Sequence, residues 1–150
     1  MIDEGGGFLI GFLFSILAGA AMSIQGVMNT RLQESAGLWE ANAYVQGTAF
    51  LLSLAVMWLW GSGNLKMLTT VPKWTLLGGV LGLVITVTVM LSIKGLQPVT
   101  AISVILIAQL VTAALIEAFG WMGQEQTPFS LKQFLGLGLM LAGVALFKLR

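Results

Sequence analysis

Long apolar stretches, separated by short polar segments, make up most of the chain. Four stretches contain no charged residue over at least 20 positions, about the length that a helix needs to cross the hydrocarbon of a bilayer: residues 5–30, 41–65, 74–93 and 95–116. A fifth stretch, residues 133–147, is shorter, but Lys132 and Lys148 flank it and their stems can reach the headgroups. The pattern therefore predicts five membrane-spanning segments.

The spanning segments are expected to be helices. The apolar runs are continuous and lack the alternation of barrel strands, and the bilayer offers no water to unpaired backbone groups. Pro98 suits the first turn of a helix, where no backbone donor is needed. The predicted fold class is all-α, an integral membrane bundle of five transmembrane helices in a single domain, residues 1–150. Its helices are expected at 8–31, 40–60, 74–94, 98–120 and 131–148.

The first apolar run could also be a signal peptide. Its leader, MIDEGGG, is acidic rather than basic, and four more spans follow it, so we expect it to be retained as a helix.

Composition narrows the functions that the chain can perform. Hydrophobic residues make up 57% of the sequence and charged residues 9%, against about a quarter charged in soluble domains, so the lipid bilayer is the first expected partner. The net charge of +1 leaves no basic surface for nucleic acid. Cysteine and histidine are absent, which excludes zinc sites built on them and Ser-His-Asp catalysis. We expect no metal, no cofactor and no enzymatic activity; chemistry on Glu and Lys alone stays a third alternative.

Basic residues are almost evenly distributed between the two sides of the membrane. With the N-terminal side named side A, side A holds three and side B four: Lys66, Lys73 and Lys132 against Arg31, Lys94, Lys148 and Arg150. The positive-inside rule then favours neither orientation strongly. Either the chain inserts in both orientations, or it has one weakly biased topology.

Polar side chains recur inside the predicted spans. Two pairs of amides have i, i+4 spacing, which places both members on one helix face, and the fourth helix carries an amide and an acid. Because polar groups cost free energy in hydrocarbon unless they find partners or water, they mark candidate sites. The candidate substrate-binding residues are Gln25, Asn29, Asn42, Gln46, Gln109 and Glu117.

Structural roles are the alternative for several of these residues. Asn29 and Asn42, near the membrane surface, could form interhelical hydrogen bonds or helix caps. Glu117 lies one turn before Trp121 and could snorkel to the headgroups. Arg31, Gln33 and Glu34, which follow Asn29, are expected only to mark the approach to water.

Depth in the membrane separates the candidates into two groups. At 1.5 Å per residue, Glu117 lies about 12 Å from the middle of its helix towards side A, whereas Gln25, Asn42 and Gln46 lie about 6 to 12 Å towards side B. These residues cannot meet within one protomer. In an antiparallel homodimer, however, the inverted copy brings its Glu117 to the depth of the amides.

Small residues indicate where helices approach one another closely. Gly78 and Gly82 form a GxxxG pair in the third helix, for which we expect intramolecular packing. The fifth helix carries a second set of small residues, for which we expect a dimer contact: Gly136, Gly138, Ala142 and Gly143.

Three stretches of the sequence resemble the YdcZ-like bacterial proteins of the drug/metabolite transporter superfamily. They are SIQGVMNTRLQESAGLWEANAYVQGTAF, PVTAISVILIAQLVTAALIEAFGWMG and FLGLGLMLAGVALF, and with them the resemblance covers nearly the whole chain. Its most specific parts are Gln25 with Asn29, Gly47, Pro98, and Gln109 leading to the run 117–120. The family often has an aspartate where this chain has Glu117. The final helix is also similar to the dimer-forming last helix of small multidrug resistance proteins.

The resemblance implies a multi-pass protein of the bacterial cytoplasmic (inner) membrane. It implies five-helix halves that occur as dual-topology homodimers, as oppositely oriented pairs or as fused ten-helix proteins, with a substrate cavity between inverted halves. Small multidrug resistance proteins carry a proton-coupling glutamate in their first helix, where this chain has only Gln25 and Asn29. Proton-coupled export of lipophilic cations therefore does not carry over.

The leading hypothesis is a small secondary transporter that moves a small polar or cationic metabolite by alternating access in an antiparallel homodimer. The alternative is a non-transporting membrane subunit, or a passive channel, that partners another half-transporter.

Overall fold

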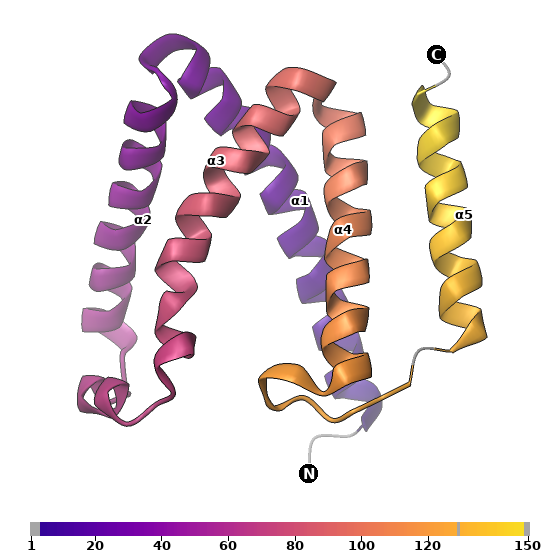
Figure 1. Ribbon diagram of the computed structural model, residues 1–150. Helices are drawn as coiled ribbons and strands as arrows, with labels where there is room; N and C mark the ends of the chain where they lie inside the picture. Colours follow the sequence, from indigo (N-terminus) through magenta and orange to yellow (C-terminus); the bar gives the residue numbers. More distant parts are fainter. Residues whose placement is uncertain (1–3, 129, 149–150) are drawn as a thin grey trace. The chain divides into compact units, whose positions relative to one another are not determined.

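The computed structural model describes residues 4–128 and 130–148, and the regular structure in these ranges is helical throughout (Figure 1). The predicted all-α class is therefore confirmed. By its internal contacts the chain divides into two compact units, Met1–Lys94 and Gly95–Arg150. That the five helices form one membrane domain stays a prediction.

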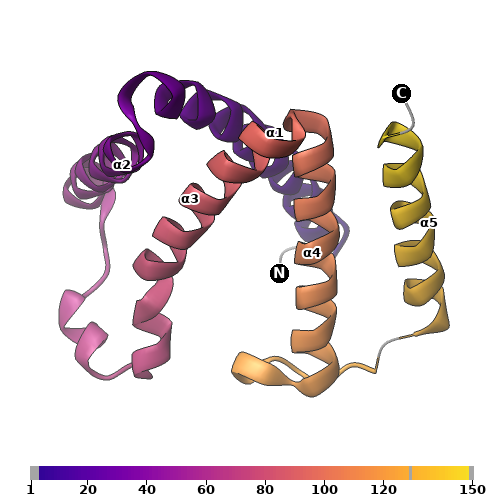
Figure 2. The same cartoon turned by 45° about the horizontal axis from the view of Figure 1, so that its top comes forward.

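Three long helices form most of the first unit. They are α1 (Glu4–Ala36), α2 (Leu38–Trp60) and α3 (Gly78–Leu96), with the short 3-10 helices η1 (Leu65–Thr69) and η2 (Lys73–Leu77) between the last two. α1 and α2 meet at one end and diverge from there, and α3 runs antiparallel to α2, as both views show (Figure 1, Figure 2).

A single residue, Gly37, separates α1 from α2. α1 was expected to end at Arg31, but it continues to Ala36. Gly37 has φ 102° and ψ 157°, a conformation that is open almost only to glycine. Its N–H donates to the Gln33 carbonyl at 3.0 Å, and its own carbonyl accepts from the Ala41 N–H at 3.0 Å. Both helices thus keep their hydrogen bonds up to this residue, and we call residues 33–42 the hinge.

Another glycine marks where α3 approaches α1. A Cβ added at Gly26 would lie 2.9 Å from Ile93 Cδ1 and 3.1 Å from Val89 Cγ1. Ile93 and the neighbouring Met90 are buried. The absence of a side chain at Gly26 therefore gives α3 its packing surface on α1.

The second unit contains α4 (Pro98–Phe119), the 3-10 turn η3 (Trp121–Gly123) and α5 (Leu131–Lys148), with α4 and α5 antiparallel (Figure 1). Pro98 begins α4, as predicted. Gly120 ends it in the left-handed conformation, φ 62°, and its N–H donates back to the carbonyls of Ile116 and Glu117.

Very little of the apolar surface is buried. Among the described residues, the buried hydrophobic ones are Ala41, Met90, Ile93 and Ala101, whereas large apolar side chains are exposed along every long helix. Four helical segments are long and apolar enough to cross a membrane: Gly7–Ala36, Leu38–Trp60, Lys73–Leu96 and Pro98–Phe119. The apolar part of α5 is shorter. Such outward apolar faces suit a bilayer, not water.

Candidate functional site

Four polar side chains are buried in the first unit, around the meeting point of α1 and α2. The exposed fractions are 8% for Asn29, 5% for Thr30, 7% for Gln33 and 4% for Asn42. With Gly26, the three α1 residues follow the spacing of one helix face. This face of α1 is therefore polar and turned inward close to the hinge.

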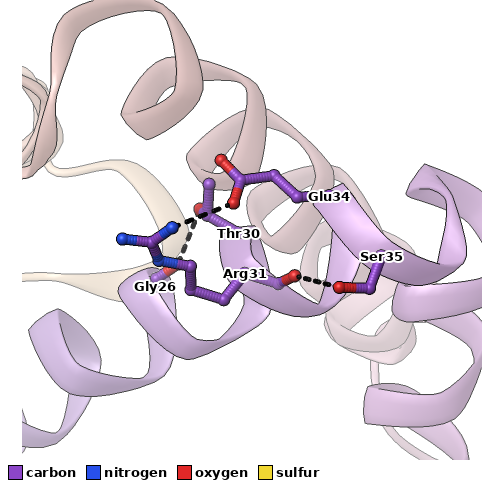
Figure 3. A network of polar contacts seen from close by, with 5 residues as sticks. All are labelled: Gly26, Thr30, Arg31, Glu34 and Ser35. Atoms are coloured by element: carbon purple, nitrogen blue, oxygen red, sulfur yellow. Dashed lines mark hydrogen bonds and ion pairs between the residues drawn. The ribbon is translucent and has the colours of Figure 1, made fainter.

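The charged residues of the same segment point outward. Arg31 Nη1 lies 3.3 Å from Glu34 Oε2, and the two side chains are 80% and 44% exposed. Thr30 Oγ1 donates to the Gly26 carbonyl of its own helix at 2.8 Å, beside this pair, as the close-up shows (Figure 3). An exposed pair of this kind contributes about 0 to 1 kcal/mol. The helix thus separates its charges from its buried amides.

Gln33 is the residue that sequence reasoning missed. It was expected to face water with Arg31 and Glu34, and this prediction was wrong, because α1 continues past it and turns it inward. Its Oε1 atom and the Oδ1 atom of Asn42 are both fully buried, and no donor within the described chain reaches either of them. Buried acceptors without a donor are uncommon in folded proteins and call for a physical explanation.

The two i, i+4 amide pairs differ in burial. In α1, Asn29 is buried and Gln25 is exposed; in α2, Asn42 is buried and Gln46 is half-buried. The Gln46 amide nitrogen lies 3.6 Å from the position of a Cβ added at Gly82 of α3. The first unit therefore brings Asn29 and Asn42 into its interior, places Gln46 against α3 and leaves Gln25 on an outer face.

A groove of about 360 Å³ lies between α4 and α5 in the second unit. Its polar lining residues are Glu117 of α4 and Gln133 of α5, and its walls are otherwise small or apolar, among them Ala113, Gly136 and Met140. The groove gives Glu117 an adjoining space of the size of a small metabolite.

Hydrogen bonds hold the end of this groove where α4 ends and α5 begins. The Glu117 carbonyl accepts from the Thr127 N–H at 3.0 Å, and Gln126 Nε2 donates to the Ala118 carbonyl at 3.1 Å. At the start of α5, the Ser130 N–H donates to Gln133 Oε1 at 2.7 Å and the Gln133 N–H donates to Ser130 Oγ at 3.3 Å. This reciprocal pair is a capping box, and it fixes the Gln133 side chain at the mouth of the groove.

Gln109 and most of the small residues of α5 lie outside the groove lining. Gln109 is exposed on α4, two turns before Glu117. A Cβ at Gly136, Gly138 or Gly143 would meet no atom within 4 Å, and Ala142 is exposed. The dimer contact predicted for these four residues stays a prediction. Of the earlier GxxxG pair, Gly82 faces Gln46 and Gly78 has open space around it.

A metal site built on acids is not found where the structure describes the chain. There, no three His, Cys, Asp or Glu side chains lie close enough together to hold an ion.

Comparison with known proteins identifies a family. No curated protein and no solved structure matches the chain. The family described as "Putative inner membrane exporter, YdcZ" matches residues 10–146, which covers all five helices and confirms the resemblance seen in the sequence. Together with the four apolar spans, this match makes the protein a multi-pass inner membrane protein of the transporter class. The chain belongs to the YdcZ family within the drug/metabolite transporters.

Proposed function

We propose that the protein is a small secondary transporter that works as an antiparallel homodimer and moves a small polar or cationic metabolite by alternating access. The observation that supports the dimer is the exposure of Gln25 and Gln109 within apolar spans. In lipid, each amide would lose hydrogen bonds to water without gaining others. A second copy of the chain would cover them.

The polar residues support a hydrogen-bonding substrate. The amides of Gln25, Gln46 and Gln109 would line a largely neutral cavity between the copies, whereas Asn29 and Asn42 are buried within the first unit. Glu117, beside its groove, would pair with a cationic group of the substrate or carry a coupling proton. Neutral amides suit hydroxyl, amide and ammonium groups better than a bulky lipophilic cation, which offers few hydrogen bonds.

Disulfide crosslinking along α5 tests the antiparallel arrangement, since the chain contains no cysteine. Gly138 lies near the middle of α5, so Gly138→Cys should form a dimer with itself. Leu131→Cys and Leu146→Cys lie at opposite ends of the described apolar helix. When two differently tagged copies are expressed together, the mixed Leu131–Leu146 pair should crosslink, whereas each variant alone should not.

Other crosslinking patterns would contradict the model. A Leu131→Cys variant that crosslinks with itself indicates a parallel dimer. Failure of both the Gly138 pair and the mixed Leu131–Leu146 pair removes α5 as the contact, and labelling of Ser62→Cys from both sides of membrane vesicles then decides whether both orientations occur.

Transport is tested with the protein in liposomes. Small polar and cationic metabolites are screened by counterflow, and the response should saturate with concentration. Gln109→Leu should abolish counterflow and ligand binding, whereas Gln124→Leu, which changes an exposed loop amide, should leave both intact. Flux that neither saturates nor shows counterflow would indicate a channel instead.

A further inference from the structure

Two buried oxygen atoms in the first unit have no hydrogen-bond donor within the described chain. They are Gln33 Oε1 and Asn42 Oδ1, on side chains that are 7% and 4% exposed. A buried carbonyl oxygen without a partner costs roughly 1 to 3 kcal/mol, so two together call for something that binds them. An oxygen can be satisfied by a hydrogen-bond donor or by a cation.

Both oxygens belong to the hinge. Gln33 lies four residues before Gly37 and Asn42 five after it, in helices that meet at this single residue (Figure 1). Thr30 lies about one turn before Gln33 and is also buried. Its hydroxyl donates to the Gly26 carbonyl, so the lone pairs of the Thr30 Oγ1 atom stay available as acceptors. The buried polar groups at the hinge are thus rich in acceptors.

The charges around the hinge favour a cation over a neutral donor. The last turn of α1 contains no basic residue, and the positive N-terminal end of α2, which begins at the same place, carries the acidic Glu40 in its first turn. The Glu40 carboxylate occupies the space that a Cβ on Gly37 would need, which places a formal negative charge directly on the hinge. The nearest basic residue in sequence, Arg31, is paired with Glu34 and points outward (Figure 3).

We propose that the hinge binds a monovalent cation, with sodium as the best fit, through Gln33 Oε1 and Asn42 Oδ1. Glu40 supplies the negative charge, while the opposed dipole ends of α1 and α2 offset one another. Helix ends with carbonyl oxygens are a recurrent setting for sodium in transporters. One carboxylate with neutral oxygens is too little charge for tight binding of calcium or magnesium. A role of this ion in coupling would rest on the proposed transport function, but its binding does not.

The test measures sodium binding to the purified full-length protein without any substrate. Thermal stability is recorded in sodium chloride, potassium chloride and N-methylglucamine chloride at equal ionic strength. Sodium should raise the melting temperature in a saturable manner, because a ligand of the native state stabilises it by mass action. Scintillation proximity with radioactive sodium gives the half-saturating concentration directly.

Substitutions identify the ligands. Gln33→Leu and Asn42→Leu should each raise the half-saturating sodium concentration by at least about tenfold, while Gln124→Leu should not change it. Gln33→Glu keeps an oxygen and adds a charge, so it should bind sodium more tightly. It also keeps the proposal testable if the leucine variants do not fold. Glu40→Gln should weaken binding, with Glu125→Gln as its matched control.

Equal stabilisation by all three chloride salts would overturn the proposal, since the two oxygens would then be satisfied by water. Binding that survives in both Gln33→Leu and Asn42→Leu would overturn it as well. Because the measurement contains no substrate, sodium binding in a protein that fails every transport assay would support the site and contradict only the transport function.

Discussion

Gly26 of α1 and Ile93 of α3 approach so closely that a Cβ on the glycine would lie 2.9 Å from the isoleucine Cδ1 atom. This contact lies in the buried part of the first unit, where Met90 and Ile93 are among the few enclosed apolar side chains. The position of α3 on α1 therefore depends on one missing side chain.

Gly26→Leu should lower the free energy of unfolding in detergent by about 1 to 3 kcal/mol, because the larger side chain overpacks the contact. Thermal unfolding of the purified protein measures the change. Gly19→Leu is the matched control on the same helix, since a Cβ there would meet no atom within 4 Å. The double variant Gly26→Leu with Ile93→Ala should recover part of the lost stability, because the smaller side chain at position 93 makes room for the leucine. Equal effects of the two glycine substitutions would show that the contact is unimportant.

Gly37→Ala should destabilise the first unit by about 1 to 3 kcal/mol, since its φ of 102° is strained for any residue with a side chain and Glu40 fills the space beside it. Gly63→Ala, at a loop glycine with open space, provides the comparison and should change stability little. Both are read from thermal unfolding. If Gly37→Ala unfolds like the parent protein, Gly37 does not hold the positive φ at the hinge.

Gln97 between α3 and α4 has φ 66° and ψ 157°, a backbone region close to that of Gly37 but occupied by a residue with a side chain. Gln97→Gly should therefore raise the free energy of unfolding by roughly 1 kcal/mol, because relief of the backbone strain exceeds the cost of the entropy that glycine adds to the unfolded chain. Gln124→Gly, where φ is −75°, should bring no gain. A loss of stability on Gln97→Gly would mean that the glutamine side chain stabilises this corner.

Ser130→Ala should destabilise α5 by about 0.5 to 2 kcal/mol, because it removes the side-chain acceptor for the Gln133 N–H, which keeps only the Ser130 carbonyl, and releases the capping box. Amide hydrogen exchange should increase over the first turn of α5 and stay unchanged in α2. Ser62→Ala, in the loop after α2, serves as the control. Unchanged exchange in α5 would show that the cap does not hold its first turn.

The sequence predicted those features that depend on long apolar runs and on residues with strong local preferences. The helices follow from the runs, and the start of α4 follows from Pro98, whose fixed φ suits a first turn. The family was also recognisable, because its motifs lie within the spans.

The hinge could not be predicted in the same way. A polar and charged segment after Asn29 reads as the end of a helix, yet α1 continues to Ala36, because Arg31, Glu34 and Ser35 can face outward while Gln33 turns in. The error in the helix end hid Gln33: a residue placed beyond a helix is assumed to be solvated. Burial of one amide rather than its i, i+4 neighbour depends on tertiary packing, which no spacing rule contains. The roles of all six candidate site residues stay predictions.

The one-residue corners at Gly37 and Gln97 also make the two faces of the membrane unequal towards a protease. In the proposed membrane bundle consecutive spans alternate in direction, which would put both corners on the same side, and Arg31 and Lys94 lie inside helices. A protease needs a segment of several residues outside the long helices, and the other side offers two, in the connections after α2 and after α4. Lys66 lies in the first of these connections. Apart from removal of the last residues after Lys148, trypsin added to sealed vesicles would thus cut only chains that present this second side, and the fraction cut in the connections would count the orientations.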